Sequence, residues 1–277
     1  MIRLAVRVRR ADAELALADL LDLVPAGVEE IDLGDTIEYA VYGAPGELPD
    51  LPDLRAAAGG ALVEVTTSAV PDDWGERWKR FHRPLLVGGR IYVRPPWEDV
   101  RPGVIDVVID PGQAFGTGAH ATTRLVLELL LEIEPRAAGG PLVDLGTGSG
   151  VLAVAAAKLG YTPVVAVDHD PASVVAAGEN AAANGVVLDV GRIDLRREAI
   201  PTAPTVLANL VSPLLIEIAP RLADPLPRRL IVSGVLVHEG DIVAAAFAAR
   251  GLVELSRREL GEWTALVLAP RGGAGLL

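Results

Sequence analysis

The chain has 277 residues, of which 51% are hydrophobic and 22% charged, so it can bury one large core or two of ordinary size. Its 25 basic and 37 acidic residues give a formal net charge of −12. This charge argues against a broad surface for nucleic-acid phosphates and would suit a basic protein partner better. The chain has no cysteine, which excludes disulfides and thiolate sites, and no apolar run of about 18 residues that could cross a membrane.

Residues 1–68 predict a small domain in which strands and helices alternate. Strands are expected at 2–8, 28–33, 36–42 and 61–67, and helices at 12–23 and 50–58. The resulting order, βαββαβ, is that of an α+β ferredoxin-like domain. Because residues 2–8 alternate apolar and basic side chains, they do not form the continuous apolar segment of a signal peptide. We therefore expect a cytoplasmic protein.

Residues 69–84 predict a linker helix. Trp74, Trp78 and Phe81 recur at positions i, i+4 and i+7, which places them on one face of a helix. That face either packs on a neighbouring domain or forms a surface for a partner or a hinge. Strands are expected next at 85–93 and 104–109.

Residues 85–277 predict a second domain, in which strands and helices alternate from about residue 128 onward. Strands are expected at 141–145, 164–167, 206–209, 229–233, 252–260 and 263–268, and helices at 151–159, 172–184, 213–222 and 240–250. Such alternation predicts a parallel sheet with helices on both faces. The last two strands are separated only by Gly261 and Glu262, which is the spacing of an antiparallel hairpin.

Three glycines, Gly146, Gly148 and Gly150, follow a buried strand and open a helix. Glycines in this context let the backbone approach a ligand at the helix N-terminus. The dinucleotide fingerprint G-x-G-x-x-G would need a glycine where this chain has Val151, and a P-loop is excluded because no lysine follows. The spacing G-x-G-x-G, with Asp144 two residues before it, instead favours S-adenosylmethionine as the ligand.

The next predicted strand ends at Asp168, about 20 residues past the glycine loop. A carboxylate at this place can accept hydrogen bonds from both hydroxyls of a ribose. Asp170, which is followed by Pro171, is instead the expected N-cap of the next helix. An acidic residue here serves NAD equally well, so the choice of cofactor depends on the glycine spacing and the terminal hairpin.

The segment 110–124 places three glycines, an aromatic residue and several hydroxyls just before the helix that precedes the strand of the glycine loop. We expect it to fold over the cofactor, with Thr122 or Thr123 capping the following helix or touching the ligand. His120 is not expected to bind a metal, and we expect no metal site. The chain has four histidines and no cysteine, and it contains neither H-x-x-x-H nor H-E-x-x-H.

Asn209 stands where the fourth strand of the sheet should end, at the carboxyl edge where α/β sheets bind ligands. Its amide can accept a hydrogen bond from a substrate amine and leave the amine lone pair aimed at a methyl group. The alternative is that Asn209 merely terminates the strand. In-line methyl transfer needs a neutral amine about 3 Å from the methyl carbon, so positioning should dominate the chemistry.

Taken together, these motifs resemble one family, the bacterial ribosomal protein L11 methyltransferases. The resemblance rests on residues 73–74, 78, 110–124, 143–153, 167–171, 208–210, 233–236 and 261–263. It covers nearly the whole chain beyond residue 70, and segment 110–124 is its most specific part because generic methyltransferases lack it.

The resemblance implies an α/β catalytic domain, a Rossmann-like class I methyltransferase with a doubly wound sheet and a terminal antiparallel hairpin, over residues 85–277. It also implies a ferredoxin-like domain at 1–68 that recognises the ribosomal protein, joined by a linker helix at 69–84. S-adenosylmethionine would be the cofactor, and lysine side chains of L11, with its α-amine as a further candidate, would accept the methyl groups. We expect a monomer that binds neither nucleic acid nor a membrane.

The resemblance implies cofactor contacts at Thr123, Gly146, Asp168 and Asn209, and Phe115 and Gly116 match its segment 110–124. The full set of residues expected to bind the cofactor is Phe115, Gly116, Thr122, Thr123, Asp144, Gly146, Gly148, Gly150, Asp168 and Asn209. Asn209 is also the expected catalytic residue. Three other interpretations stay open. The first is a methyltransferase that acts on another protein, a nucleic acid or a small molecule. The second is a nicotinamide-dependent oxidoreductase, which Val151 disfavours, and the third is a binding module without activity.

Overall fold

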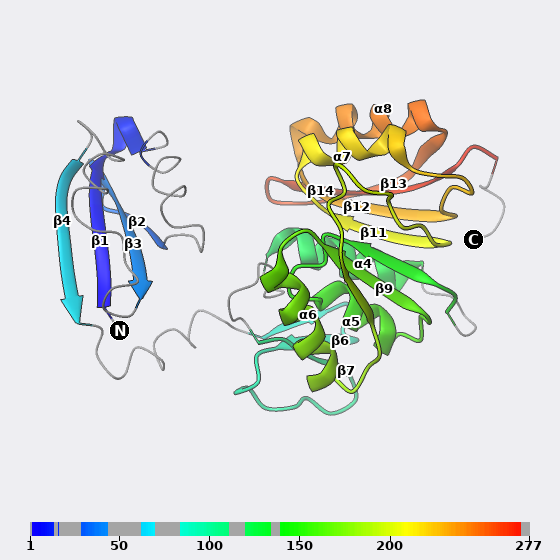
Figure 1. Cartoon of the computed structure of the whole chain (residues 1–277), viewed down its shortest axis with the longest axis horizontal. Coiled ribbons are helices and arrows are strands. Elements are labelled where there is room, and N and C mark those ends of the chain that lie inside the picture. Colours follow the sequence, from blue (N-terminus) through cyan, green and yellow to red (C-terminus); the bar gives the residue numbers. More distant parts are fainter. Residues whose placement is uncertain are drawn as a thin grey trace. The chain divides into compact units, whose positions relative to one another are not determined.

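The computed structural model describes residues 2–13, 16, 29–43, 62–69, 84–110, 120–133 and 139–272. The chain divides into two compact units, Met1–Arg80 and Phe81–Leu277, and Figure 1 shows the elements of each. Within the described residues, no helix is long and apolar enough to span a membrane.

The first unit contains a four-stranded sheet in the order β2-β3-β1-β4. The strands are β1 (Ile2–Arg9), β2 (Glu29–Asp32), β3 (Thr36–Gly43) and β4 (Leu62–Ala69), and a short 3-10 helix follows β1 at Arg10–Asp12. All neighbouring strands are antiparallel. Alternate residues of β1, namely Leu4, Val6 and Val8, enter a buried core with Ile37 and Tyr39 of β3. The four strands agree with the predicted ones to within two residues, whereas most of the two predicted helices lie outside the described residues.

The second unit is built on a seven-stranded sheet in the order β10-β9-β8-β11-β12-β14-β13. The strands are β8 (Leu142–Leu145), β9 (Val164–Asp168), β10 (Asp189–Arg192), β11 (Thr205–Asn209), β12 (Arg229–Leu236), β13 (Leu252–Leu260) and β14 (Trp263–Pro270). The first five strands in this order, β10, β9, β8, β11 and β12, are parallel to one another. Strand β14 is antiparallel to both of its neighbours, β12 and β13. The predicted terminal hairpin is thus confirmed, and the turn at Gly261 has a φ of 62°.

Helices cover both faces of this sheet (Figure 1). The helices are α4 (Ala121–Glu132), α5 (Val151–Lys158), α6 (Pro171–Ala183), α7 (Ser212–Ile218) and α8 (Gly240–Arg250). Residues of β11 alternate between the two resulting cores. Leu207 packs in the core with α4 and α5, whereas Val206 and Ala208 pack in the core with α7 and α8. The largest buried side chain on the second side is Phe247 of α8.

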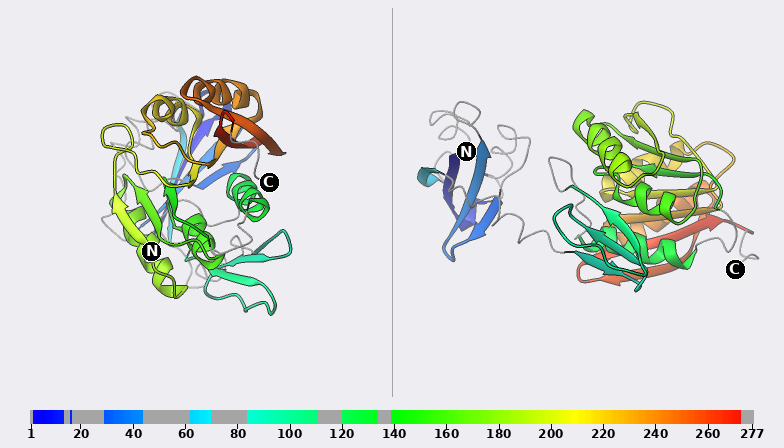
Figure 2. Two further views of the ribbon diagram at one scale, coloured as in Figure 1. Left: turned by 90° about the vertical axis from the view of Figure 1, so that its right-hand side faces the viewer. Right: turned by 90° about the horizontal axis from the view of Figure 1, so that it is seen from below.

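A small three-stranded sheet precedes α4 in the chain and is drawn in teal in Figure 2. It consists of β5 (Leu85–Val87), β6 (Ile91–Arg94) and β7 (Ile105–Val108). Its buried valines and isoleucines belong to the same core as α4 and α5. The prediction of one strand over 85–93 was wrong. Gly88 and Gly89, with φ of 54° and 68°, form a turn that folds the segment into a hairpin.

Candidate functional site

The glycine loop connects the buried strand β8 to α5, and its three glycines all have positive φ: 73° at Gly146, 53° at Gly148 and 82° at Gly150. Two of them also lack room for a side chain. A Cβ on Gly146 would lie 2.3 Å from Cδ2 of Leu210, and one on Gly150 would lie 3.0 Å from Cα of Ala177. The loop therefore needs glycine both for its conformation and for its close packing.

The loop is tied to strand β9 through backbone hydrogen bonds. The N–H groups of Gly146 and Thr147 both donate to the carbonyl of Val167, at 2.8 Å and 2.9 Å. The next loop residue, Gly148, donates its N–H to Oδ2 of Asp168 at 2.9 Å. The glycine loop and the carboxylate that ends β9, predicted separately from the sequence, thus form one site.

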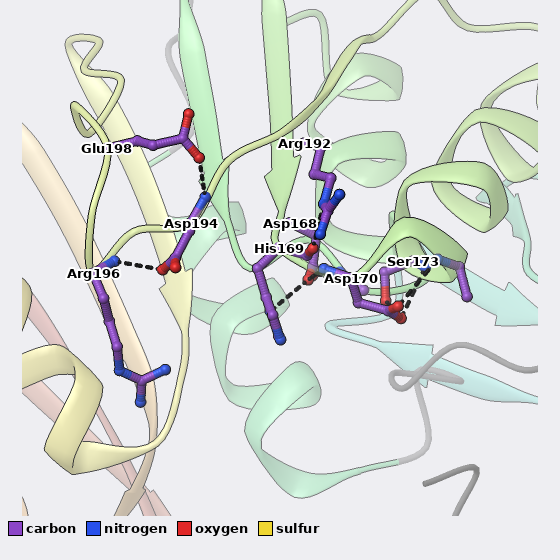
Figure 3. Close-up of polar contacts among 10 residues, drawn as sticks. Asp168, His169, Asp170, Ser173, Arg192, Asp194, Arg196 and Glu198 are labelled. Carbon is purple, nitrogen blue, oxygen red and sulfur yellow. Dashed lines mark hydrogen bonds and ion pairs between the residues drawn. The ribbon is translucent and has the colours of Figure 1, made fainter.

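Asp168 is held from two sides, and Figure 3 shows its surroundings with His169, Asp170 and Arg192. While Oδ2 accepts the Gly148 N–H, Oδ1 accepts the N–H of Asp170 at 3.1 Å and lies 3.3 Å from Nδ1 of His169. Arg192, at the end of β10, donates from Nε to the His169 carbonyl at 2.9 Å and so fixes the turn after β9. A carboxylate oxygen has two lone pairs, so Oδ2 of Asp168, which accepts one N–H, can still accept a hydroxyl.

Asp170 has the structural role that was predicted for it. Its Oδ1 accepts the N–H of Ala172 and its Oδ2 the N–H of Ser173, both at 3.1 Å, and it is the N-cap of α6. Pro171 occupies the first position of the helix. The two neighbouring acidic residues are therefore separated in function by geometry: Asp170 satisfies the start of a helix, and Asp168 faces the glycine loop.

Asp144 lies beneath the glycine loop and is completely buried. Its Oδ2 accepts the Thr147 hydroxyl at 2.7 Å, while Oδ1 has no hydrogen-bond partner of normal geometry among the described residues. Burial raises the pKa of Asp144 to about 7, although the Thr147 hydroxyl and the nearby N–H of Ala153 favour the ionised form. Asp144 therefore supports the glycine loop from inside the protein, through its hydrogen bond with Thr147.

A second group of polar residues gathers at the start of α4. The N-cap of this helix is His120, whose Nδ1 accepts the N–H of Thr122 at 3.4 Å and whose ring lies edge-on to Trp263. Of the two roles predicted for Thr122 or Thr123, capping the helix was therefore wrong, and contact with the ligand stays a prediction. The extended backbone of a cap is found at His120, and both threonines lie in the first helical turn, almost fully buried.

Asn209 ends β11 and meets Thr123 across 86 residues of sequence, with its Nδ2 3.5 Å from the Thr123 Oγ1. The residue after it, Leu210, donates its backbone N–H to the Ser233 carbonyl at 2.9 Å. A Cβ on Gly234 would lie only 2.4 Å from the Leu210 carbonyl oxygen, so glycine at 234 permits this close approach. The Leu210 side chain in turn contacts Gly146, which connects the Asn209 segment to the glycine loop.

The predicted residues Gly146, Gly148, Asp168 and Asn209 thus lie at the carboxyl ends of the parallel strands β8, β9 and β11, where α/β sheets bind ligands. Phe115 and Gly116 lie outside the described residues. Two contributors, Leu210 and Asn180, were not singled out from the sequence, although asparagines at 180 and 184, one helical turn apart, were a usable signal. Among the residues that the structure describes, no cluster of three metal-ligating side chains occurs.

Comparisons with known proteins agree with this geometry. A family profile described as ribosomal protein L11 methyltransferase (PrmA) matches residues 54–271. A protein named ribosomal protein L11 methyltransferase from Symbiobacterium thermophilum is 40% identical over 261 residues, which cover 90% of this chain and 84% of the relative. The chain belongs to the ribosomal protein L11 methyltransferase family.

Further relatives in this family include a protein of the same name from Geobacter sulfurreducens, which is 36% identical over 89% of this chain and 85% of its own length. A crystal structure described as ribosomal protein L11 methylase from Lactobacillus delbrueckii subsp. bulgaricus superimposes with a TM-score of 0.59 at 29% identity. It covers 68% of this chain and 98% of that chain. The family resemblance predicted from the motifs is confirmed.

As a member of the L11 methyltransferase family, the chain is an S-adenosylmethionine-dependent methyltransferase with a class I α/β fold. The chemistry of the site fits this cofactor. The remaining acceptor capacity of the Asp168 carboxylate complements a ribose hydroxyl donor, and the three glycines leave alternate positions of the loop before α5 without a side chain.

Proposed function

We propose that this chain transfers methyl groups from S-adenosylmethionine to lysine side-chain amines of ribosomal protein L11, and to its α-amine. The observation that carries the proposal is the pairing of Asn209 with Thr123 beside the glycine loop, in a chain whose relatives bear the name ribosomal protein L11 methyltransferase. An amide at the carboxyl edge of β11 is suited to orient an amine, which agrees with a protein lysine as the methyl acceptor.

Within this proposal, Asp168 accepts the ribose hydroxyls, and Gly146, Gly148 and Gly150 let the cofactor lie against the backbone. Asp144 supports the loop through the hydroxyl of Thr147. Four further cofactor contacts are proposed from the family motif, at Phe115, Gly116, Thr122 and Thr123.

S-adenosylmethionine supplies an electrophilic methyl group attached to a sulfonium. The protein's own contribution is to position the amine, and Asn209 is the residue placed to do so. Because its Nδ2 is turned toward Thr123, its Oδ1 remains able to accept a hydrogen bond from the amine. This contact would direct the nitrogen lone pair toward the methyl carbon, and correct orientation accounts for much of the rate of such displacements.

The acceptor lysine must be neutral to react. A lysine in water has a pKa of about 10.4 and is protonated at neutral pH. Transfer of the ammonium into a site with less water lowers its pKa, so the proton can leave to solvent before attack. This mechanism needs no strong base from the protein, and it makes turnover rise with pH as the neutral amine becomes more abundant.

We further propose that the chain has three functional parts. Residues 1–68 form a ferredoxin-like domain that recognises the substrate, residues 69–84 a linker helix, and residues 85–277 the catalytic domain. The antiparallel sheet order β2-β3-β1-β4 supports the first assignment, and the net charge of −12 suits a basic ribosomal protein. The enzyme would act as a monomer in the cytoplasm, without direct contact to nucleic acid or a membrane.

The proposal is tested by incubating the full chain with tritiated S-adenosylmethionine and either recombinant L11 or ribosomal RNA. We expect label in L11 alone, and peptide mass mapping should place the added methyl groups on lysines or the α-amine. The variant Asn209→Ala serves as the matched control for background methylation. Label that enters RNA, or that never enters L11, would contradict the proposed substrate.

A further inference from the structure

Two asparagines lie one turn apart at the end of helix α6: Asn180 is in its last turn, and Asn184 is its C-cap. Asparagine is a poor helix former, because its side chain competes with the backbone for hydrogen bonds. Here both side chains bind the backbone of other segments, and Asn184 also donates from Nδ2 to the Asn180 carbonyl at 2.7 Å. Their position near the glycine loop suggests that they do more than stabilise the helix.

The two asparagines hold neighbouring points of the segment that leaves β7. Asn184 pairs with Val108 in both directions: its Nδ2 donates to the Val108 carbonyl at 2.6 Å, and its Oδ1 accepts the Val108 N–H at 2.9 Å. Asn180 accepts the N–H of Asp110 on its Oδ1 at 3.0 Å. Both side chains thus hold the backbone of the segment that follows β7.

Only Asn180 also reaches the glycine loop. Its Nδ2 donates to the carbonyl of Ser149 at 2.8 Å, and both residues are almost fully buried. The approach depends on Gly150, where a Cβ would lie 3.0 Å from Cα of Ala177, three residues before Asn180 on the same helix. Glycine in the loop thus lets α6 come close enough for the amide to bind Ser149.

We propose that Asn180 is a positioning residue that sets the affinity for S-adenosylmethionine by fixing the glycine loop through the Ser149 carbonyl. Ser149 lies between Gly148, whose N–H binds Asp168, and Gly150, which is the N-cap of α5. The Ser149 carbonyl belongs to the peptide group that joins Ser149 to Gly150, so the bond from Asn180 fixes the orientation of that peptide next to Gly148. The loop then presents the Gly148–Asp168 pair in one geometry before the ligand arrives. This inference rests on the proposed cofactor site.

Three variants separate the loop contact from the general docking of α6. Asn180→Ala removes both side-chain hydrogen bonds. Asn180→Asp keeps an acceptor for the Asp110 N–H but places a carboxylate oxygen against the Ser149 carbonyl. Asn184→Ala is the matched control, because Asn184 is the C-cap of the same helix, holds the same segment and makes no hydrogen bond to the glycine loop among the described residues. This variant also removes the bond from Nδ2 of Asn184 to the Asn180 carbonyl.

We expect calorimetry with S-adenosylmethionine to show a Kd about tenfold higher for Asn180→Ala, and at least as high for Asn180→Asp. Asn184→Ala should stay within about twofold of the unmodified chain. With L11 as substrate, the two Asn180 variants should raise KM for S-adenosylmethionine far more than they lower kcat. Circular dichroism and urea unfolding of each variant show which fraction is folded during the titration.

A folded Asn180→Asp variant that binds S-adenosylmethionine like the unmodified chain would overturn the inference, since the loop contact would then be unimportant. The same holds if Asn184→Ala weakens binding as much as Asn180→Ala, because the effect would belong to helix docking. If the unmodified chain itself fails to bind S-adenosylmethionine, the proposed cofactor site is wrong, and this result is distinct from the other two.

Discussion

The substitution Asp168→Asn tests the cofactor site most directly. Both carboxylate oxygens of Asp168 accept a backbone N–H, from Gly148 at 2.9 Å and from Asp170 at 3.1 Å. An amide has only one acceptor oxygen, so in either orientation its NH2 group faces one of these N–H donors. Leaving a part-buried N–H without an acceptor costs up to about 1–3 kcal/mol. The amide also loses one charge-assisted acceptor for a ribose hydroxyl, which contributes about 1.5–3 kcal/mol.

The N–H left without an acceptor destabilises the free protein as well as the complex, so only part of its cost appears in binding. We therefore expect the binding free energy to weaken by about 3 kcal/mol, or roughly 150-fold in Kd. Calorimetric titration with S-adenosylmethionine measures this loss. The control is Asp170→Asn, which removes the same charge two residues away but keeps a good N-cap for α6, and it should change Kd by about twofold at most. The reasoning is refuted if Asp168→Asn binds within about threefold of the unmodified chain, or if both variants lose affinity equally.

Three further predictions follow from the described residues. Gly146→Ala combines a φ of 73° with a Cβ placed 2.3 Å from Leu210, so urea unfolding should show that the free energy of unfolding falls by about 2–4 kcal/mol. The control is Gly160→Ala, where φ is 97° but the space is open, and it should lower the free energy of unfolding by only about 1 kcal/mol. Equal losses would show that the Leu210 contact is harmless. Asn209→Ala should lower kcat by about 100-fold while the Kd for S-adenosylmethionine stays within about threefold, and unchanged turnover would remove its catalytic role. The folded-state pKa of Asp144 is raised to about 7, so the folded chain binds more protons than the unfolded chain, and unfolding free energy should fall as pH rises from about 4 to about 7. Asp144→Asn should flatten this slope in unfolding curves measured across that range; a slope that persists would assign it to other groups.

Local chemistry was enough to predict much of this protein from its sequence. The parallel strands β8, β9, β11 and β12 are mostly apolar, because both of their faces are covered, and they were placed to within a few residues. Asp170 followed by Pro171 marked the start of α6, since an N-cap and its proline are adjacent in sequence. The glycine loop was also recognisable from local sequence, because glycine stands at its three positions of positive φ, Gly146, Gly148 and Gly150.

Features without a local cause were missed or misplaced. Strand β10 has the sequence Asp-Val-Gly-Arg and no apolar pattern, and it exists because it pairs with β9. The N-cap of α4 is His120 and not a threonine. The ring of His120 packs edge-on against Trp263 of the terminal hairpin, which is distant in sequence.

The contacts that connect the site also depend on the tertiary structure. The sequence by itself determined the family, the doubly wound sheet and the residues Gly146, Gly148, Asp168 and Asn209 as candidates. Only the folded chain decided that Gly148 binds Asp168, that Thr123 meets Asn209 and that Asn180 reaches Ser149. The physical reason is that each of these bonds joins residues that are 20 or more positions apart, and their distances are set by how strands and helices pack.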